Sequence, residues 1–197
     1  MKRYDRRYFD RWYRSARWRV LTAAELERRA RMVIALGEYL LERPVASVLD
    51  VGCGEGAWYL ALRTLRPRIR YVGVDPSPYV VQRFGARRHI RSGSLEHLGE
   101  LRQVEPFDLV LCVDVLHYLP SPAVELGLAH LGPLTGGLAY LPVFTSGDAF
   151  EGDRNGLRRR PAAYYRRAFA NAGLTPCGPH CYVSSAVAEQ ATALELL

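Results

Sequence analysis

Val48-Leu49-Asp50-Val51-Gly52-Cys53-Gly54-Glu55-Gly56-Ala57-Trp58 is the stretch of the sequence that decides the fold. It begins as a short apolar strand, turns through three glycines at alternating positions and continues into an apolar segment typical of a helix start. A strand, a glycine turn and a helix form the first half of a nucleotide-binding crossover unit. Glycine suits such a turn because the chain reverses tightly there and a ligand must approach the backbone closely.

Two details of this turn indicate the kind of ligand. Dinucleotide enzymes carry the pattern G-x-G-x-x-G, whereas here Ala57 stands where the third glycine would fall. Asp50 comes two residues before the first glycine, at the end of the strand. A carboxylate in that place suits a ligand with a cationic amino group better than a pyrophosphate.

A second apolar segment, residues 70–74, ends at Asp75, which lies 21 residues after Gly54. An acidic residue at the end of the second strand of such a unit accepts hydrogen bonds from ribose hydroxyls. The alternative is that Asp75 caps the following helix, because Pro76-Ser77-Pro78 is a typical helix start.

A third informative segment is residues 107–119, with the sequence FDLVLCVDVLHYL. Residues 107–114 predict a buried strand, and His117 then falls at the start of the next helix. Ligands bind outside the carboxyl ends of such strands, where the strand order reverses. We therefore expect His117 at the ligand edge of the sheet, while Asp114 is expected to orient the turn between strand and helix.

The turn at residues 50–56 resembles the first motif of the class I S-adenosylmethionine (SAM) methyltransferases, and residues 107–119 resemble the fourth motif of the members that act on small molecules. The resemblance covers about residues 45–183. It implies an α/β fold of the Rossmann-like type: a doubly wound, mostly parallel seven-stranded sheet with an N-terminal helical arm. It also implies SAM as cofactor, S-adenosylhomocysteine as product and a small-molecule methyl acceptor.

The same resemblance implies residue roles. Asp50 and the Cys112 carbonyl would hold the amino group of SAM, and Asp75 the ribose. Ser94 departs from the family, which most often has Asp there for the adenine amino group, so Leu95 more safely supplies packing on the ring. The predicted cofactor-binding residues are Asp50, Gly52, Cys53, Gly54, Asp75, Pro76, Ser94, Leu95, Cys112 and Val113.

His117 is the candidate catalytic residue. An acceptor that must lose a proton requires a general base, and histidine has the appropriate pKa for that role. The alternative is a residue of the pocket wall with no part in proton transfer.

The first 44 residues are predicted to form a helical arm or lid, and residues 45–197 the cofactor-binding domain. Residues 1–19 hold eight Lys or Arg and two Asp, out of a net charge of +7 for the chain. A helical period over residues 4–19 predicts one amphipathic helix with an aromatic face. The positive charge of residues 1–19 is compatible with an acidic acceptor, with nucleic acid as a partner or with a helix face exposed to solvent. The resemblance of residues 107–119 to the fourth motif favours a small molecule over nucleic acid. The run Arg158-Arg159-Arg160 also suits an acidic acceptor, or else is solvated surface.

Three further elements are predicted. Thr22 and Glu25 form a capping-box pattern that opens a helix with Tyr39 on its buried side. A short hairpin is expected about Gly178-Pro179, and a final helix over residues 186–196.

Composition sets the remaining expectations. The sequence has no run of eighteen apolar residues, so we expect no membrane span, and the charged, aromatic N-terminus does not have the pattern of a signal peptide. Four cysteines without a disulfide framework indicate a reducing cytoplasm. Cys177, His180 and Cys181 lack a fourth zinc ligand, so we predict no metal site.

Three other interpretations stay open. They are a catalytically silent SAM-binding subunit or sensor, a methyltransferase that acts on RNA through the basic arm, and an NAD-dependent oxidoreductase. Asp50 and the absent third glycine count against the oxidoreductase. The sequence leaves the oligomeric state open.

Overall fold

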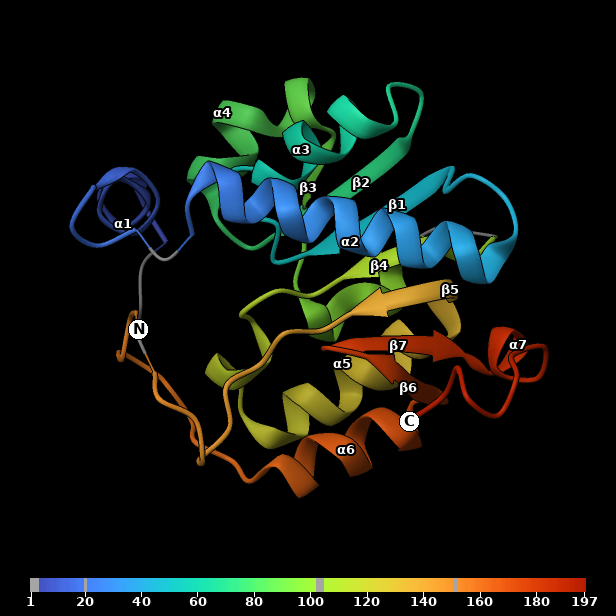
Figure 1. The fold of residues 1–197 in the computed structure, drawn as a ribbon. Helices are drawn as coiled ribbons and strands as arrows, with labels where there is room; N and C mark the ends of the chain where they lie inside the picture. The colour runs from blue at the N-terminus through green and yellow to red at the C-terminus, as the bar shows by residue number, and fades with distance from the viewer. Residues whose placement is uncertain (1–3, 20, 102–104, 151) are drawn as a thin grey trace.

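The predicted strands form one seven-stranded sheet in the order β3-β2-β1-β4-β5-β7-β6 (Figure 1). The computed structural model describes residues 4–19, 21–101, 105–150 and 152–197. Neighbouring strands from β3 to β5 are parallel, and β7 is antiparallel to β5 and β6. The strands are β1 (Ser47–Val51), β2 (Arg70–Asp75), β3 (Ile90–Ser92), β4 (Phe107–Leu111), β5 (Thr135–Tyr140), β6 (Leu174–Gly178) and β7 (Cys181–Ser184).

Helices cover both faces of this sheet, α2 and α3 on one face and α5 and α6 on the other (Figure 1). The predicted fold class, doubly wound and mostly parallel, is therefore confirmed. The helices are α1 (Arg6–Phe9), α2 (Ala23–Leu41), α3 (Ala57–Leu65), α4 (Pro78–Arg88), α5 (Ser121–Leu134), α6 (Ala162–Asn171) and α7 (Ser185–Ala188). A π-helical segment, η1 (Asp10–Arg14), and two 3₁₀ segments, η2 (Leu95–Glu100) and η3 (Leu116–Tyr118), complete the set.

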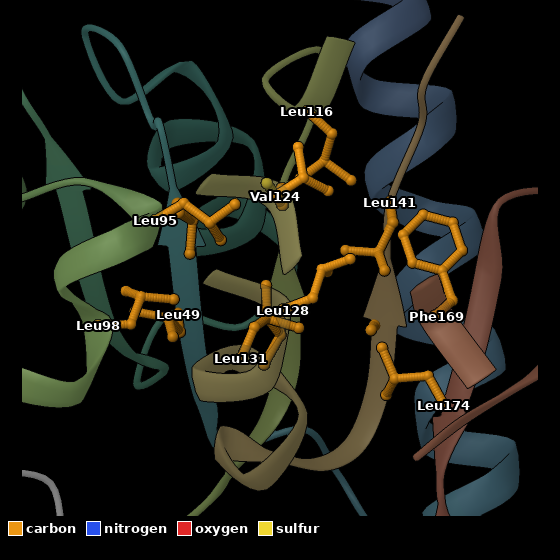
Figure 2. Packing of buried hydrophobic residues seen from close by; sticks show 14 of the residues in the cluster. Leu49, Leu95, Leu98, Leu116, Val124, Leu128, Leu131, Leu141, Phe169 and Leu174 are labelled. Carbon is orange, nitrogen blue, oxygen red and sulfur yellow. The ribbon is translucent and has the colours of Figure 1, made fainter. Parts of the chain in front are cut away.

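The strands bury side chains on both faces because successive residues of a strand point to opposite sides. In β1, Val48 belongs to the core beneath α2 and α3, whereas Leu49 belongs to the core beneath α5 and α6. Figure 2 shows the second core, in which Leu128 and Leu131 of α5 lie between Leu49 of β1 and Leu174 of β6. Each fully buried side chain of this size contributes about 1.5–3 kcal/mol, so these contacts hold the strands firmly in place.

The strand order reverses beside β1, with β2 and β3 on one side of it and β4 and β5 on the other. The register pairs Asp50 of β1 with Gly73 of β2 and with Leu111 of β4. The loops that follow these three strands therefore meet at one edge. In open α/β sheets this is the place where ligands bind.

In place of the one helix predicted over residues 4–19, the structure has two short segments, the α-helix α1 and the π-helical segment η1. α1 continues directly into η1, and Ser15 then has extended backbone. The wider turn closes with the Ser15 N–H, which donates to the Asp10 carbonyl at 3.1 Å, the i→i+5 bond of a π-helix. The prediction of one continuous helix was therefore wrong. The sequence pattern could not reveal this, because aromatic residues spaced four apart fit an α-helix and a π-helical turn equally well.

The structure also differs from the predictions in the burial of one side chain of α2 and in the residues at which β4 and α7 end. Tyr39 is 64% exposed rather than buried, and its hydroxyl donates to Glu195 at 2.6 Å. β4 ends at Leu111 instead of residue 114, and α7 ends at Ala188 instead of residue 196. The capping box at Thr22 and the hairpin between β6 and β7 are confirmed.

Candidate functional site

A cavity of about 430 Å³ lies at the edge where the loops after β1, β2 and β4 meet. This volume is within the range of small-molecule sites in proteins. His117 lines the cavity, and Cys112 does not. The other predicted cofactor-binding residues line it as well: Asp50, Gly52, Cys53, Gly54, Asp75, Pro76, Ser94, Leu95 and Val113.

The glycine turn has the geometry that its sequence predicts. Gly52 and Gly54 have φ values of 70° and 53°, in the region that side chains disfavour. A Cβ on Gly52 would lie 2.4 Å from Val115 Cγ2, and one on Gly54 would lie 2.8 Å from the Tyr13 hydroxyl. No larger residue fits either position without displacing a neighbour.

Asp75 fastens the glycine turn to the loop after β2. Its carboxylate accepts the N–H of Gly54 at 2.9 Å and the N–H of Ser77 at 2.9 Å. Burial raises the pKa of this carboxyl, and the two N–H donors act in the opposite direction. The side-chain cap of α4 is Ser77, whose Oγ accepts the Val80 N–H at 3.2 Å, so Asp75 is not the helix cap that the sequence allowed.

Asp50 is buried beneath the turn, with 1% of its surface exposed. The Tyr71 hydroxyl donates to its Oδ2 at 2.5 Å. Burial raises the pKa of the Asp50 carboxyl to about 7, the Tyr71 hydrogen bond opposes this, and the nearby Asp75 charge adds to it. The group therefore changes charge near neutral pH.

Asp114 is a third carboxylate of the cavity wall, a position that the sequence analysis did not assign to it. Its backbone is left-handed, with φ of 57°, a conformation that concentrates at functional sites in residues other than glycine. Burial raises the pKa of its carboxyl to about 6, and Arg29 opposes this rise. Together with Asp50 and Asp75 it gives the cavity a wall that favours a cationic ligand. An aspartate at the last position of a predicted strand was the signal available in the sequence.

The remaining predicted cofactor residues are placed differently from one another. The Ser94 hydroxyl is already engaged, 3.1 Å from Glu96 Oε2 and 2.8 Å from His97 Nδ1. Leu95 is 2% exposed and adds apolar surface to the cavity. The Cys112 side chain is buried in the core beneath α5, so its contact through the backbone carbonyl stays a prediction.

The ring of His117 is part of the cavity wall and has no exposed surface. The Phe144 N–H lies 3.5 Å from its Nδ1, and the rings of Phe144 and Phe150 have centroids 5.5 and 5.8 Å from that of the imidazole. A general base must come within hydrogen-bond distance of the proton that it takes. The covered ring must move before it can do so, and its catalytic role stays a prediction.

Residues 4–19, the first part of the predicted arm and called the arm from here on, form the roof of the cavity. Phe9 is 2% exposed and packs against Cys53 of the glycine turn. Arg14 Nη2 donates to both carboxylate oxygens of Glu55, at 2.6 and 2.5 Å, and the Tyr79 hydroxyl donates to the same carboxylate at 3.1 Å. The arm is thus fastened to the turn through Glu55, which the sequence analysis had not singled out. Its residues on the cavity are Tyr4, Tyr8, Phe9, Trp12 and Tyr13.

The arginine run at residues 158–160 is used largely to hold its own loop. Arg160 is 8% exposed and donates to the carbonyls of Leu116 and Leu119, at 3.4 and 2.5 Å. Arg159 donates to the Ser146 carbonyl at 2.8 Å. These guanidinium groups are bound to backbone of this chain and fix the loop beside η3.

The described residues also bear on metal binding and on membrane insertion. Across the described ranges, no three His, Cys, Asp or Glu side chains are arranged to hold a metal ion. In the same residues no helix has the length and apolar character needed to cross a membrane. The four cysteines are free thiols.

Curated relatives match part of the chain. A tRNA U34 carboxymethyltransferase of Colwellia psychrerythraea is 30% identical over 92 residues, 44% of this chain and 28% of the relative. A malonyl-[acyl-carrier protein] O-methyltransferase of Dechloromonas aromatica is 32% identical over 57% of this chain and 46% of the relative. A ubiquinone biosynthesis O-methyltransferase of Hahella chejuensis is 36% identical over 41% and 35%. The chain thus spans less than half the length of these relatives.

Solved structures share the fold. A 1,6-didemethyltoxoflavin-N1-methyltransferase of Burkholderia thailandensis superposes with a TM-score of 0.56 at 22% identity, over 81% of this chain and 78% of that one. An amino pentose methyltransferase of Micromonospora echinaspora gives 0.61 at 18% identity, over 80% and 90%. The sequence model of the methyltransferase domain matches residues 22–191. With the class I Rossmann-like sheet and its glycine turn, this match shows that the chain belongs to the methyltransferase domain family.

Proposed function

We propose that this chain is a SAM-dependent methyltransferase that transfers a methyl group to a small-molecule acceptor. The observation that carries the proposal is the cavity over the glycine turn, where Asp50, Asp75 and Asp114 meet. SAM has an ammonium group, a sulfonium sulfur and a ribose diol. A wall of carboxylates complements the two cationic centres and accepts hydrogen bonds from the hydroxyls.

The residues of the cavity fit this cofactor group by group. The bare backbone of Gly52 and Gly54 leaves room for a ligand to approach the turn. Asp50 would hold the ammonium, Asp75 the ribose hydroxyls, and Leu95 would pack on the adenine ring.

Bound SAM supplies a methyl group that is already activated by its sulfonium leaving group. The chain therefore has to place the acceptor in line with that methyl and exclude water. The aromatic roof of Tyr8, Phe9 and Tyr13 provides the exclusion. A proton acceptor is needed only where the attacking atom must lose a proton.

Two solved structures of the same fold support a small-molecule acceptor, since they are named as methyltransferases of 1,6-didemethyltoxoflavin and of an amino pentose. The curated relatives include both kinds of acceptor. Two of these relatives are named as a malonyl-[acyl-carrier protein] O-methyltransferase and a ubiquinone biosynthesis O-methyltransferase. The relatives named for tRNA U34 carboxymethylation match 38–56% of this chain. An acidic acceptor suits the positive arm, and free thiols at all four cysteines suit a cytoplasmic location.

Calorimetric titration with SAM, S-adenosylhomocysteine and NAD tests the cofactor. We expect binding of the first two and none of NAD. Binding of NAD without S-adenosylhomocysteine contradicts the proposal. Turnover in a panel of candidate acceptors then separates a methyltransferase from a silent sensor.

Replacing Asp75 with Ala should weaken S-adenosylhomocysteine binding by about 10- to 150-fold, because hydrogen bonds to a charged group contribute about 1.5–3 kcal/mol. The change also strands the N–H groups of Gly54 and Ser77, so we expect a lower melting temperature. Calorimetry and thermal denaturation measure the two effects.

The control for this prediction is Ser184→Ala. Ser184 caps α7 by accepting the Val187 N–H at 3.4 Å, and its loss should cost about 1 kcal/mol of stability with no change in cofactor affinity. If Asp75→Ala is destabilised but binds S-adenosylhomocysteine as the wild type does, Asp75 only supports the turn.

His117→Ala distinguishes a base from a wall residue. Because the ring is covered by Phe144 and Phe150, we expect the variant to change KM for the acceptor while the pH dependence of kcat survives. A general base would instead give a loss of about 10²–10⁴-fold in kcat and a changed pH profile. His130→Ala on α5, outside the cavity, is the control.

A further inference from the structure

A second and larger cavity, of about 1170 Å³, adjoins the cofactor cavity. It lies between the N-terminal arm and the loop residues 149–150 and 152–155. The two cavities share wall residues: Tyr8, Trp12, Phe144, Phe150, Gly152 and Asp153. We call the larger cavity the arm groove. A molecule bound in the arm groove lies next to the place assigned to the methyl donor.

Positive charge predominates in the arm groove. Five arginines and two aspartates line it. The arginines are Arg7, Arg11, Arg17, Arg19 and Arg154. Within the described residues none of these five has a carboxylate at ion-pair distance, whereas Arg6 and Arg14 of the same arm pair with Asp10 at 3.5 and 2.6 Å.

The two aspartates of the arm groove are already engaged by backbone donors. Asp5 accepts the Tyr8 N–H at 3.1 Å, and Asp153 accepts the Asn155 N–H at 2.9 Å. The five arginines of the groove outnumber these two carboxylates, so the groove presents guanidinium groups to an anion. Arginine is suited to this because its planar fork binds carboxylate and phosphate through paired hydrogen bonds.

The arm groove also offers flat surfaces. The Arg11 guanidinium lies 5.0 Å from the ring centres of both Trp12 and Trp18, and that of Arg17 lies 4.9 Å from Trp18. Indole and guanidinium planes both stack on aromatic rings. This combination suits a flat ring that carries a negative group.

We propose that the arm groove is the acceptor site and that the acceptor is a small aromatic or heteroaromatic molecule bearing a phosphate or carboxylate group. The inference rests on the proposed methyltransferase function. A strand of nucleic acid needs a basic track along several phosphates, whereas here the arginines converge on one groove bounded by the arm and a single loop. An acceptor seated on the guanidinium groups would extend its ring past Trp12 and Phe144 toward the cofactor cavity.

Binding of simple probes to the full chain tests the proposal. Phenyl phosphate, benzoate and benzyl alcohol would be titrated by calorimetry and by amide NMR shifts, with and without saturating S-adenosylhomocysteine. We expect the anions to bind at least ten times more tightly than benzyl alcohol. The tighter of the two anions identifies the group that the acceptor carries.

Variants from the two walls of the groove locate the binding site. Arg11→Gln on the arm and Arg154→Gln on the loop should each weaken anion binding about 5- to 10-fold. Arg167→Gln on α6, which also removes one positive charge but lies outside both cavities, should leave it unchanged. Arg154→Gln keeps the test valid if Arg11→Gln disturbs the arm.

Several results overturn the proposal: equal binding of benzyl alcohol, no binding of either anion at 10 mM, or full affinity in both groove variants. Much tighter binding of a ten-nucleotide oligo(U), lost in both variants and steep in salt, assigns the groove to RNA instead. S-adenosylhomocysteine binding is measured on the same samples. If the anions bind normally but S-adenosylhomocysteine does not, the cofactor assignment is rejected. If S-adenosylhomocysteine binds but the anions do not, only the assignment of the arm groove as acceptor site is rejected.

Discussion

Replacing Asp50 with Asn should stabilise the ligand-free protein at pH 8 and at the same time weaken S-adenosylhomocysteine binding by about 30-fold or more. The two effects have opposite signs because the buried carboxylate is unfavourable until a cation pairs with it. A rise in pKa from 3.8 to about 7 corresponds to a cost on the order of 4 kcal/mol for ionised Asp50 in the folded state. Removing one partner of a buried charge pair costs about 2–5 kcal/mol of binding free energy.

The sign of the pH dependence follows from the raised pKa. Between about pH 4 and pH 7 the folded carboxyl holds a proton that the unfolded chain has lost, so stability falls as pH rises through this window. Affinity for the ammonium group rises over the upper part of the same window, by at most about tenfold per pH unit, and levels off above about pH 7. The Asn variant should lack both changes.

Thermal denaturation and calorimetry from pH 5 to pH 8.5 measure these effects. Tyr71→Phe is the matched variant, because it removes only the hydroxyl that donates to Asp50 and should move the midpoint of the affinity change to higher pH. Glu27→Gln, which alters an exposed ion pair with Arg31 on α2, is the control for net charge. If Asp50→Asn binds S-adenosylhomocysteine like the wild type, Asp50 does not contact the amino group.

Deleting residues 1–19 should leave the sheet folded and weaken S-adenosylhomocysteine binding by about 50- to 100-fold, mainly through faster dissociation. The arm covers the cavity with aromatic side chains that include Tyr8, Phe9 and Tyr13. Covering about 100 Å² of apolar ligand surface contributes about 2.5 kcal/mol, which is roughly 70-fold in affinity. The two large cores lie beneath α2, α3, α5 and α6 and do not include the arm.

Stopped-flow dissociation and circular dichroism measure the two parts of this prediction. Arg14→Gln keeps the arm but removes its ion pair with Glu55, and it should increase the dissociation rate by a smaller factor than the deletion does. A truncated protein that retains S-adenosylhomocysteine as the wild type does would reduce the arm to a surface segment. Loss of salt-sensitive RNA binding on truncation would instead assign the arm to nucleic acid.

Local patterns account for the parts of the fold and cavity that could be predicted. The glycine turn and Asp75 are each fixed by a strand end and the residues next to it, so short stretches of sequence were sufficient. The capping box of α2 is a relation between residues three apart and is likewise readable. The strand order followed from the family resemblance and places these residues at one edge.

Features that depend on tertiary contacts could not be predicted. Arg160 and Arg158 look alike in sequence, yet only the packing against η3 shows that the Arg160 guanidinium is bound to backbone carbonyls. The arm groove needs two segments more than 120 residues apart to meet. Tyr39 has the periodicity of a buried residue, but α2 turns it outward toward Glu195 near the C-terminus.

The fastening of the arm to Glu55 has a consequence for the order of events in the proposed reaction. The arm roofs the cofactor cavity and supplies most of the arginines of the arm groove. Cofactor exchange requires the arm to lift, and an acceptor has its full site only when the arm is seated. Steady-state kinetics should therefore follow a compulsory order, with SAM binding first and S-adenosylhomocysteine leaving last. Product inhibition by S-adenosylhomocysteine should be competitive toward SAM and noncompetitive toward the acceptor.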